Sequence, residues 1–301
     1  MASFEVEHIV KTFGSQRAVD DVTFAVEPGE IFGLLGPNGA GKTTTIRIAL
    51  DIFKPDSGRV AVLGGPMSED KKNRIGYLPE ERGLYQDIRL EQCILYLATL
   101  KGLDRHTAQT RMEAYLEQFD LVAHRRKKLK ELSKGMQQKA QLIVTLIHEP
   151  ELLIVDEPFS ALDPVNTQMI KDVLREQRRK GTTIVMCTHQ MNQVEELCDR
   201  LVLINRGRVM LYGALDEIRR QYRSHTVLVR SLNGLPDGLV GVERVEPING
   251  SVALHLRPDA SPQAVLQELV QRSVQLEQFE VALPTLDEIF IEVVTGKETT
   301  A

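Results

Sequence analysis

Residues 36–44 read GPNGAGKTT and follow a short apolar run that predicts a buried strand. The segment fits the pattern G-x-x-x-x-G-K-[ST], in which a glycine-rich loop joins a strand to a helix. Gly39 and Gly41 allow backbone N–H groups to converge on phosphate oxygens. Lys42 supplies a positive charge for the outer phosphates, and Thr43 offers a hydroxyl to Mg²⁺. Because the strand, the spacing and the Lys-Thr pair occur together, we interpret the segment as a phosphate-binding loop and not as a chance glycine-rich turn.

Further apolar runs predict a parallel sheet that is covered by helices on both faces. The runs ELLIVDEP (151–158) and TTIVMCTH (182–189) have the continuous hydrophobicity of strands buried on both sides. Segments 4–8 and 22–26 alternate apolar and polar residues, which predicts half-buried strands of an N-terminal antiparallel part. Helical periodicity in residues 80–135 predicts an inserted helical lobe. The fold class that follows is α/β.

The length of the chain predicts two domains. At 301 residues it exceeds one ordinary hydrophobic core, so a large domain and a small one are expected. We place the large domain at 1–215 and a linker helix, DEIRRQYR, at 216–223. Residues 224–301 then follow the order strand, strand, strand, helix, strand, helix, with Thr285 and Glu288 as a capping box before the last helix. They predict a small α+β domain with an accessory or regulatory role.

The composition narrows the class of protein. Lys and Arg number 37 against 42 Asp and Glu, a formal net charge of −5, which does not favour a nucleic-acid-binding surface. No apolar stretch approaches the roughly 20 residues that cross a bilayer, and the N-terminus lacks the basic and apolar regions of a signal peptide. The three cysteines form no CxxC pair. These features are expected of a reduced, soluble protein inside the cell.

Acidic residues end the strand that ELLIVDEP predicts. Asp156 and Glu157 fall at its C-terminal end, the edge at which α/β sheets bind ligands. At a phosphate site, Asp156 would help to hold Mg²⁺, and Glu157 would orient and deprotonate the attacking water. A solvated strand edge is the alternative for this pair. His189 ends the next buried strand at the same edge, where it would either touch a γ-phosphate or serve only the structure.

Residues 132–139, LSKGMQQK, predict a second helix start that is suited to an anion. Ser133 occupies an N-cap position, and Gly135 leaves the first turn without a side chain. One chain therefore carries two phosphate-binding helix starts, and a single nucleotide bound within one chain does not obviously need both.

The motifs resemble those of ABC-transporter ATP-binding subunits, and they occur in the same order. They are GPNGAGKTT, LSKGMQQK, LLIVDEP, SALDP (160–164) and THQ (188–190). The resemblance covers residues 4–215, and the signature segment LSKGMQQK is the most specific part of it. It implies the P-loop NTPase core of an ABC ATPase, with ATP and Mg²⁺ as cofactors.

The resemblance also implies roles for individual residues. Ser133 and Gly135 would contact the γ-phosphate of nucleotide bound to the opposite subunit, and residues 160–163 would form a D-loop across the interface. His189 would be the switch histidine. Phe13 would take the position where an aromatic ring stacks on adenine, with a buried strand-end phenylalanine as the alternative.

The expected nucleotide contacts come from the phosphate loop, the strand ends and the signature. They are Phe13, Gly36, Pro37, Asn38, Gly39, Ala40, Gly41, Lys42, Thr43, Thr44, Glu80, Ser133, Gly135, Asp156 and Asp163. Three of these residues, Thr43, Glu80 and Asp156, are expected to bind the metal ion. Glu157 and His189 are the expected catalytic residues.

The chain departs from the usual family motifs at two places. The signature usually reads Leu-Ser-Gly-Gly-Gln, and here Lys134 and Met136 replace its first glycine and its glutamine. The Q-loop usually offers a glutamine after a strand, whereas YLPEERGLY (77–85) offers Glu80, whose carboxylate can still reach Mg²⁺ or water. This variant and the closing PTLDEIFIEVV (284–294) look like the type-2 exporter subfamily, which includes sodium and drug exporters.

The resemblance implies an ATP-hydrolysing subunit that dimerises around two Mg-ATP and drives export through a separate integral-membrane permease. The second subunit is expected to be another copy of the chain, since the presence of every half-site element permits a homodimer; a paralogue is the alternative partner. The expected location is cytoplasmic, on the inner face of the cell membrane through the permease, with no nucleic-acid partner. Two alternatives stay open: a soluble ABC ATPase acting on nucleic acid or ribosomes, and a regulatory module that binds ATP without hydrolysing it. The basic run HRRKKLK (124–130) is interpreted as a solvated face.

Overall fold

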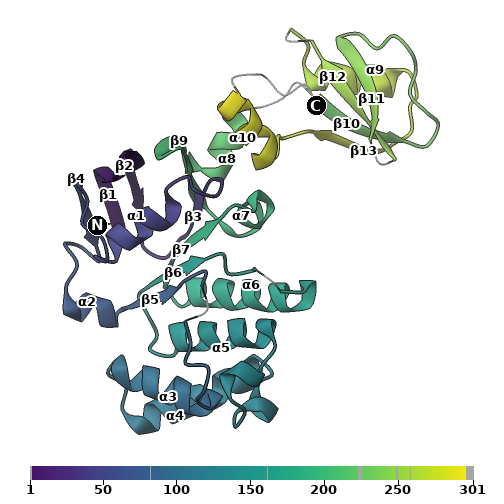
Figure 1. The fold of residues 1–301 in the computed structure, drawn as a ribbon. Helices are drawn as coiled ribbons and strands as arrows, with labels where there is room; N and C mark the ends of the chain where they lie inside the picture. The colour runs from purple at the N-terminus through teal and green to yellow at the C-terminus, as the bar shows by residue number, and fades with distance from the viewer. Residues whose placement is uncertain are drawn as a thin grey trace. The chain divides into compact units, whose positions relative to one another are not determined.

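A six-stranded sheet forms the centre of the first structural unit, residues 1–215. The computed structural model describes residues 2–81, 83–160, 162–222, 226–248, 250–257 and 259–295. The strand order is β5-β6-β7-β3-β8-β9, in which the first five strands are parallel and β9 is antiparallel to β8. The strands are β3 Ile31–Leu35, β5 Ile75–Leu78, β6 Leu152–Asp156, β7 Thr183–Thr188, β8 Arg200–Asn205 and β9 Arg208–Ala214. This sheet with its helices confirms the predicted α/β class (Figure 1).

Strands β6 and β7 are buried along their length because helices cover both faces of the sheet. Every residue of β6 and β7 is buried. On one face, Phe32 and Ile154 share a core with Ile46 of α1 and with the N-terminal strands. The helices α5, α6 and α7 lie on the other side of the sheet (Figure 1). These helices are α1 Lys42–Ala49, α5 Lys134–Leu146, α6 Pro164–Arg179 and α7 Met191–Leu197.

The predicted antiparallel part is a separate three-stranded sheet with the order β2-β1-β4. Its strands are β1 Phe4–Phe13, β2 Gln16–Val26 and β4 Ser57–Val62. Phe4 and Val6 are buried as the alternation predicts. His8, however, has a φ of 49° and is exposed, and a register shift places Ile9 in the core instead. The predicted alternation through His8 was wrong because a bulge adds one residue to the strand.

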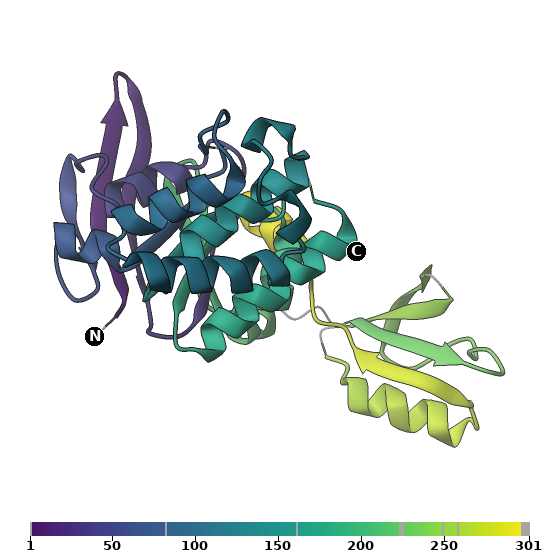
Figure 2. The ribbon, with the colours of Figure 1, turned by 90° about the horizontal axis from the view of Figure 1, so that it is seen from below.

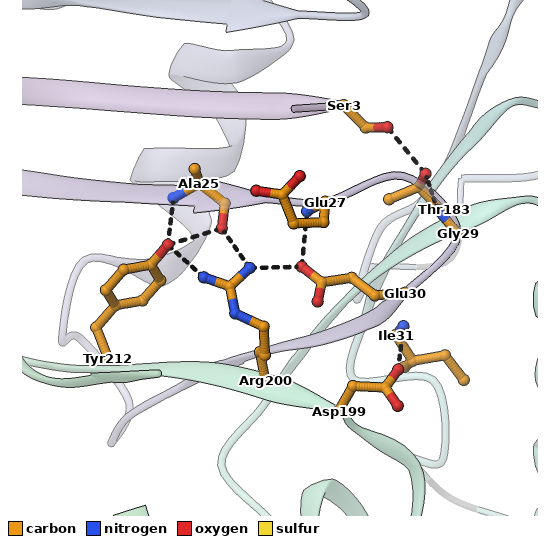
Figure 3. A network of polar contacts seen from close by, with 10 residues as sticks. All are labelled: Ser3, Ala25, Glu27, Gly29, Glu30, Ile31, Thr183, Asp199, Arg200 and Tyr212. Atoms are coloured by element: carbon orange, nitrogen blue, oxygen red, sulfur yellow. Dashed lines mark hydrogen bonds and ion pairs between the residues drawn. The ribbon is translucent and has the colours of Figure 1, made fainter. Parts of the chain in front are cut away.

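A polar network joins this sheet to the central one, close to where β2 leads into β3 (Figure 3). The Arg200 guanidinium donates to Glu30 Oε1 at 3.1 Å and to the Tyr212 hydroxyl at 2.6 Å. Burial raises the pKa of the Glu30 carboxyl. The Asp199 carboxylate accepts the backbone N–H of Ile31, the first residue of β3, at 3.0 Å. Because β3 leads directly into the glycine-rich loop, these contacts hold the base of the strand that presents the loop.

The predicted helical lobe contains α3, α4 and two short 3₁₀ turns, which pack with α5 (Figure 2). The elements of the lobe are α3 Leu90–Leu100, α4 Arg105–Gln118, η1 Val122–His124 and η2 Leu129–Glu131. The short helix α2 Glu69–Asn73 lies before the lobe and precedes β5. The basic run 124–130 lies beside the start of α3. Arg125 pairs with Glu91 at 3.0 Å, and Lys130 pairs with Asp87 at 2.7 Å. Part of the run therefore serves the packing of the lobe.

The second unit comprises residues 216–301 and contains a four-stranded antiparallel sheet with the order β11-β12-β10-β13. Its elements are β10 Thr226–Ser231, β11 Val242–Ile248, β12 Ser251–Leu256, α9 Pro262–Gln271, β13 Leu276–Val281 and α10 Leu286–Thr295. The order of strands and helices is the predicted one. Val229 of β10 and Leu269 of α9 belong to one apolar core. The predicted capping box is present, because Glu288 N donates to Thr285 Oγ1 at 3.2 Å and Thr285 N donates to Glu288 Oε2 at 2.7 Å.

The remaining helix, α8, lies at Leu215–Gln221 and overlaps the predicted linker segment 216–223, beginning one residue before it. Arg223, the last residue of that predicted linker, lies outside the described residues. None of the helices in the described part of the chain is both long and apolar enough to span a bilayer.

Candidate active site

The glycine-rich loop connects β3 to α1 and is closely surrounded by backbone. A Cβ atom at Gly36 would lie 2.0 Å from the carbonyl oxygen of Ile204, and one at Gly41 would lie 2.4 Å from that of Ala18. Both glycines have positive φ values, 147° and 108°, which residues with a side chain rarely adopt. The loop therefore keeps bare backbone at the N-terminus of α1, where an anion is favoured.

Lys42 is the first residue of α1, and its ammonium lies inside the loop. Nζ donates to the carbonyl oxygen of Gly36 at 2.7 Å and to that of Pro37 at 3.2 Å. The residue is 6% exposed. An ammonium is a compact positive charge, and here the loop holds it against α1, where it can neutralise a phosphate.

A hydrogen bond joins the loop to the predicted acidic strand end. Thr43 Oγ1 donates to Asp156 Oδ2 at 3.2 Å. Asp156 is 2% exposed, and burial raises the pKa of its carboxyl to about 6. The negative charges of Glu80 and Glu157 also contribute to this raised pKa, whereas the Thr43 hydrogen bond and the Lys42 charge oppose it. A cation beside Asp156 would remove the penalty for ionising it in this buried place.

The carboxylate of Glu157 is held by the end of the neighbouring strand β7. The Thr188 hydroxyl donates to Oε2 at 3.1 Å. The His189 backbone N–H donates to Oε1 at 3.0 Å, and the His189 ring Nδ1 lies 2.6 Å from the same oxygen. An ionised carboxylate can only accept, so this contact requires the proton on Nδ1. The two strand ends thus bring Glu157 and His189 together at the edge of the sheet where both were predicted.

The phosphate loop and the acidic residues line one cleft of about 450 Å³. Its lining consists of Gln16, Ala18, residues 38–44, Glu80, Asp156 and Glu157. Glu80, Asp156 and Glu157 are therefore neighbours of the loop, although they lie far from it in the sequence. Gln16 and Ala18 were not predicted. No local pattern marks them, because they reach the cleft only through the position of β2 beside the loop.

The second helix start and the D-loop residues do not line this cleft. Ser133 caps α5 by accepting a backbone N–H of the first turn at 3.3 Å, which confirms the predicted helix start. Asp163 caps α6 in the same way. A Cβ at Gly135 would lie 3.5 Å from the Leu162 side chain, so the two segments are neighbours. Ala161 of the predicted D-loop lies outside the described residues.

Phe13 ends β1 and is 45% exposed. The alternative of a buried strand-end phenylalanine was therefore wrong. The Phe13 ring meets the Phe53 ring edge-on with 5.4 Å between centroids, and the Lys11 ammonium lies 5.6 Å from the Phe13 centroid. Phe13 does not belong to the cleft lining, and its contact with adenine stays a prediction.

Known protein families and a bacterial relative match this chain in sequence. A family model described as ABC transporter matches residues 19–160, and one described as ATP-binding protein DrrA1-3-like, C-terminal domain, matches residues 213–294. The chain is 38% identical to the uncharacterized ABC transporter ATP-binding protein YhaQ of Bacillus subtilis (strain 168), over 95% of this chain and 97% of that protein. The chain belongs to the ABC transporter ATP-binding proteins.

Two further relatives of this ABC protein agree in sequence and in fold. The chain is 36% identical to the Nod factor export ATP-binding protein I of Burkholderia pseudomallei (strain 1710b), over 71% of each chain. A solved ATP binding subunit of an ABC transporter has a TM-score of 0.69 and 34% sequence identity, over 73% of this chain and 92% of that chain. The predicted family, the predicted fold and the capacity to bind ATP are thereby confirmed.

The donors in the cleft of the ABC protein suit Mg²⁺. The Thr43 hydroxyl and the carboxylates of Asp156 and Glu80 are oxygen ligands, which Mg²⁺ prefers, and this ion commonly completes its shell with phosphates and water. Within the described ranges, no group of three or more His, Cys, Asp or Glu residues is arranged to hold a metal. The contact between Thr43 and Asp156, beside the phosphate loop, fits a metal ion that the protein and a nucleotide share.

Replacing Asp156 with asparagine is expected to stabilise the nucleotide-free ABC protein at neutral pH. The ordinary pKa of this carboxyl is 3.8, and burial raises it to about 6, so the folded state binds the proton more tightly than the unfolded state. The stability that the Asp156 carboxyl contributes is fully present below its pKa in the unfolded state. This stability is lost as pH rises through its pKa in the folded state. Asparagine avoids that loss, so the free energy of unfolding should rise by about 3 kcal/mol at neutral pH and by less than about 1 kcal/mol near pH 4.

Urea unfolding without Mg²⁺ or ATP at the two pH values measures this difference. Asp172→Asn is a matched control, because Asp172 is exposed on α6 and should show no comparable pH dependence. An equal effect of Asp156→Asn at both pH values would contradict the raised pKa.

Proposed function

We propose that this chain is the ATP-hydrolysing subunit of an ABC exporter. The observation that carries the proposal is the Glu157 carboxylate, which lines the same cleft as Lys42 and Asp156 and is oriented by Thr188 and His189. A module that only binds ATP would not need an oriented base beside the phosphate loop. The arrangement therefore favours an enzyme over the regulatory module.

In this proposal the phosphate loop binds and orients the nucleotide. Lys42 neutralises the outer phosphates, and the backbone of the glycine-rich loop surrounds them. Thr43, Asp156 and Glu80 hold the metal ion. Mg²⁺ when bound supplies positive charge that stabilises the phosphate oxygens during transfer.

Glu157 acts as the general base. A carboxylate has about four lone-pair positions, and the contacts from Thr188 and His189 occupy three of them. The remaining position accepts a proton from water while the water oxygen attacks the γ-phosphorus. The bond between that phosphorus and the β–γ bridging oxygen breaks, and ADP leaves with this oxygen. A second ring proton, on Nε2, would let His189 donate to a γ-phosphate oxygen.

Each nucleotide is shared by two subunits. Ser133, Gly135 and Asp163 do not line the cleft of their own chain, and Ser133 and Asp163 are exposed, which supports a role for them in the site of a partner. Phe13 stacks on adenine in its own chain. A homodimer is the simplest assembly, because one chain carries both halves of the composite site.

The transport role rests on the relatives. The name of one relative includes Nod factor export, and the family model that matches the second unit is described as DrrA1-3-like. We accordingly assign the chain to the inner face of the cell membrane, bound to a separate permease, with the second unit as an accessory or partner-contacting domain. A soluble ABC ATPase acting on nucleic acid has no supporting feature in the cleft or in the net charge of −5.

Phosphate release from the purified chain tests the proposal. We expect steady release in the presence of ATP and Mg²⁺, and a fall of at least tenfold when EDTA removes the metal, because the metal contributes several kcal/mol of charge stabilisation. Addition of excess Mg²⁺ should restore the rate. ATP binding without any release, even after co-purification with a permease, would favour the regulatory module instead.

A further inference from the structure

Gln141 of the helix α5 donates two hydrogen bonds to the loop that carries Glu80. Its Nε2 donates to the carbonyl oxygen of Glu81 at 3.2 Å and to that of Pro79 at 3.4 Å. These two carbonyl groups flank Glu80 on either side. The single amide therefore holds the backbone before and after the residue whose carboxylate lines the cleft.

The surroundings of Gln141 indicate that this side chain does more than fill space. The residue is 4% exposed, and its Oε1 is buried with no hydrogen-bond partner among the described residues. Both neighbours are carbonyl oxygens, so only the NH₂ end of the amide can face them. A buried acceptor without a partner is unfavourable, and leucine of similar size would fill the same space without that penalty.

Neighbouring positions on the same face of α5 contact the same region. Gln138 Nε2 donates to the carbonyl oxygen of Pro158 at 3.4 Å, and Thr145 Oγ1 donates to that of Tyr77 at 3.5 Å. Residues spaced three, four and seven apart lie on one side of a helix. This face of α5 therefore runs along the ends of β5 and β6, the strands that precede Glu80 and Glu157.

Electrostatics explain why the Glu80 loop needs to be held. Glu80 stands where the family usually has glutamine, and it lines the same cleft as the buried Asp156 carboxyl. Two carboxylates that face one cleft repel each other when no cation lies between them. Without a restraint on the backbone, this repulsion would favour conformations in which Glu80 leaves the cleft.

We propose that Gln141 is a positioning residue that keeps the Glu80 carboxylate in the cleft beside Asp156. Ser133 caps the start of the same helix, about 12 Å away along its axis at 1.5 Å per residue. Gln141 thereby links the position of the signature start to the position of Glu80. The inference rests on the proposed function, because it takes Glu80 to act on Mg²⁺ or water during hydrolysis.

The substitution Gln141→Leu tests the inference in the full chain. Amide hydrogen exchange should become faster in peptides that contain Glu80 and stay unchanged in peptides from α5, because the loop loses its restraint while the helix keeps its packing. Phosphate release should fall by about tenfold, as expected when a catalytic group is misplaced. The Mg²⁺ concentration for half-maximal release should rise, and ATP binding measured without Mg²⁺ should not change.

A double-mutant cycle with Glu80→Ala separates positioning from a general structural effect. If Gln141 acts through Glu80, Gln141→Leu should have little further effect in the Glu80→Ala background. Gln177→Leu is the matched control, because Gln177 is also 4% exposed but lies on α6 outside the cleft.

Equal losses from Gln141→Leu in both backgrounds, or wild-type exchange and release in the single variant, would overturn the inference. A wild-type chain that releases no phosphate would instead reject the proposed function, so the two failures are distinguishable.

Discussion

Glu157→Gln is expected to abolish steady-state ATP hydrolysis while leaving ATP binding intact. The amide has the shape of the carboxylate and can still accept from Thr188 or His189, but it cannot take a proton from water. General bases contribute about 10²–10⁴-fold to such reactions, so phosphate release should fall by at least a hundredfold. Because ATP is bound but not consumed, ATP-bound dimers should accumulate, and size-exclusion chromatography with ATP would detect them.

A control at the other end of the same strand makes this result specific. Glu151 precedes β6, and its side chain pairs with Arg74 at 2.6 Å on the surface. Glu151→Gln removes a charge without touching the cleft and should keep hydrolysis close to the wild-type rate. Undiminished phosphate release by Glu157→Gln would reject Glu157 as the general base.

The second expected result is that two inactive variants restore activity when they are mixed. Lys42→Ala removes the positive charge of a subunit's own phosphate loop. Ser133→Arg fills the capped start of α5, which is proposed to face the γ-phosphate on the partner. In a mixed dimer, one composite site carries both lesions and the other pairs an intact Lys42 with an intact Ser133. At equal amounts, random exchange predicts recovery of up to about a quarter of the wild-type rate.

A mixture of two lesions in the phosphate half provides the control. Lys42→Ala with Asp156→Ala damages both sites of every dimer, so this pair should show no recovery. Subunit exchange is verified with two affinity tags, and ATP-dependent dimerisation is a second readout if the two sites must act together. A signature that served its own chain would produce no recovery for Lys42→Ala with Ser133→Arg at any mixing ratio.

The sequence was sufficient for the features that arise from neighbouring residues. The phosphate loop lies within one strand–loop–helix unit, so the spacing of Gly36, Gly41 and Lys42 already defines it. The apolar run before Asp156 predicts a strand covered on both faces, and the Ser133 cap predicts the start of α5. Local patterns failed where one inserted residue changes the register, as at His8 in β1.

Contacts between distant segments required the tertiary structure. The bond from Thr43 to Asp156 spans 113 residues, and the contacts of Gln141 with the Glu80 loop span 60 and 62. Such pairs depend on the order of strands in the sheet and on where each helix crosses it. The periodicity of a single segment predicts neither the strand order nor the helix position. The residues that bind phosphate could therefore be predicted from the sequence. Their position in one cleft depends on the arrangement of the strands, and so does the contact of α5 with the loop that carries Glu80.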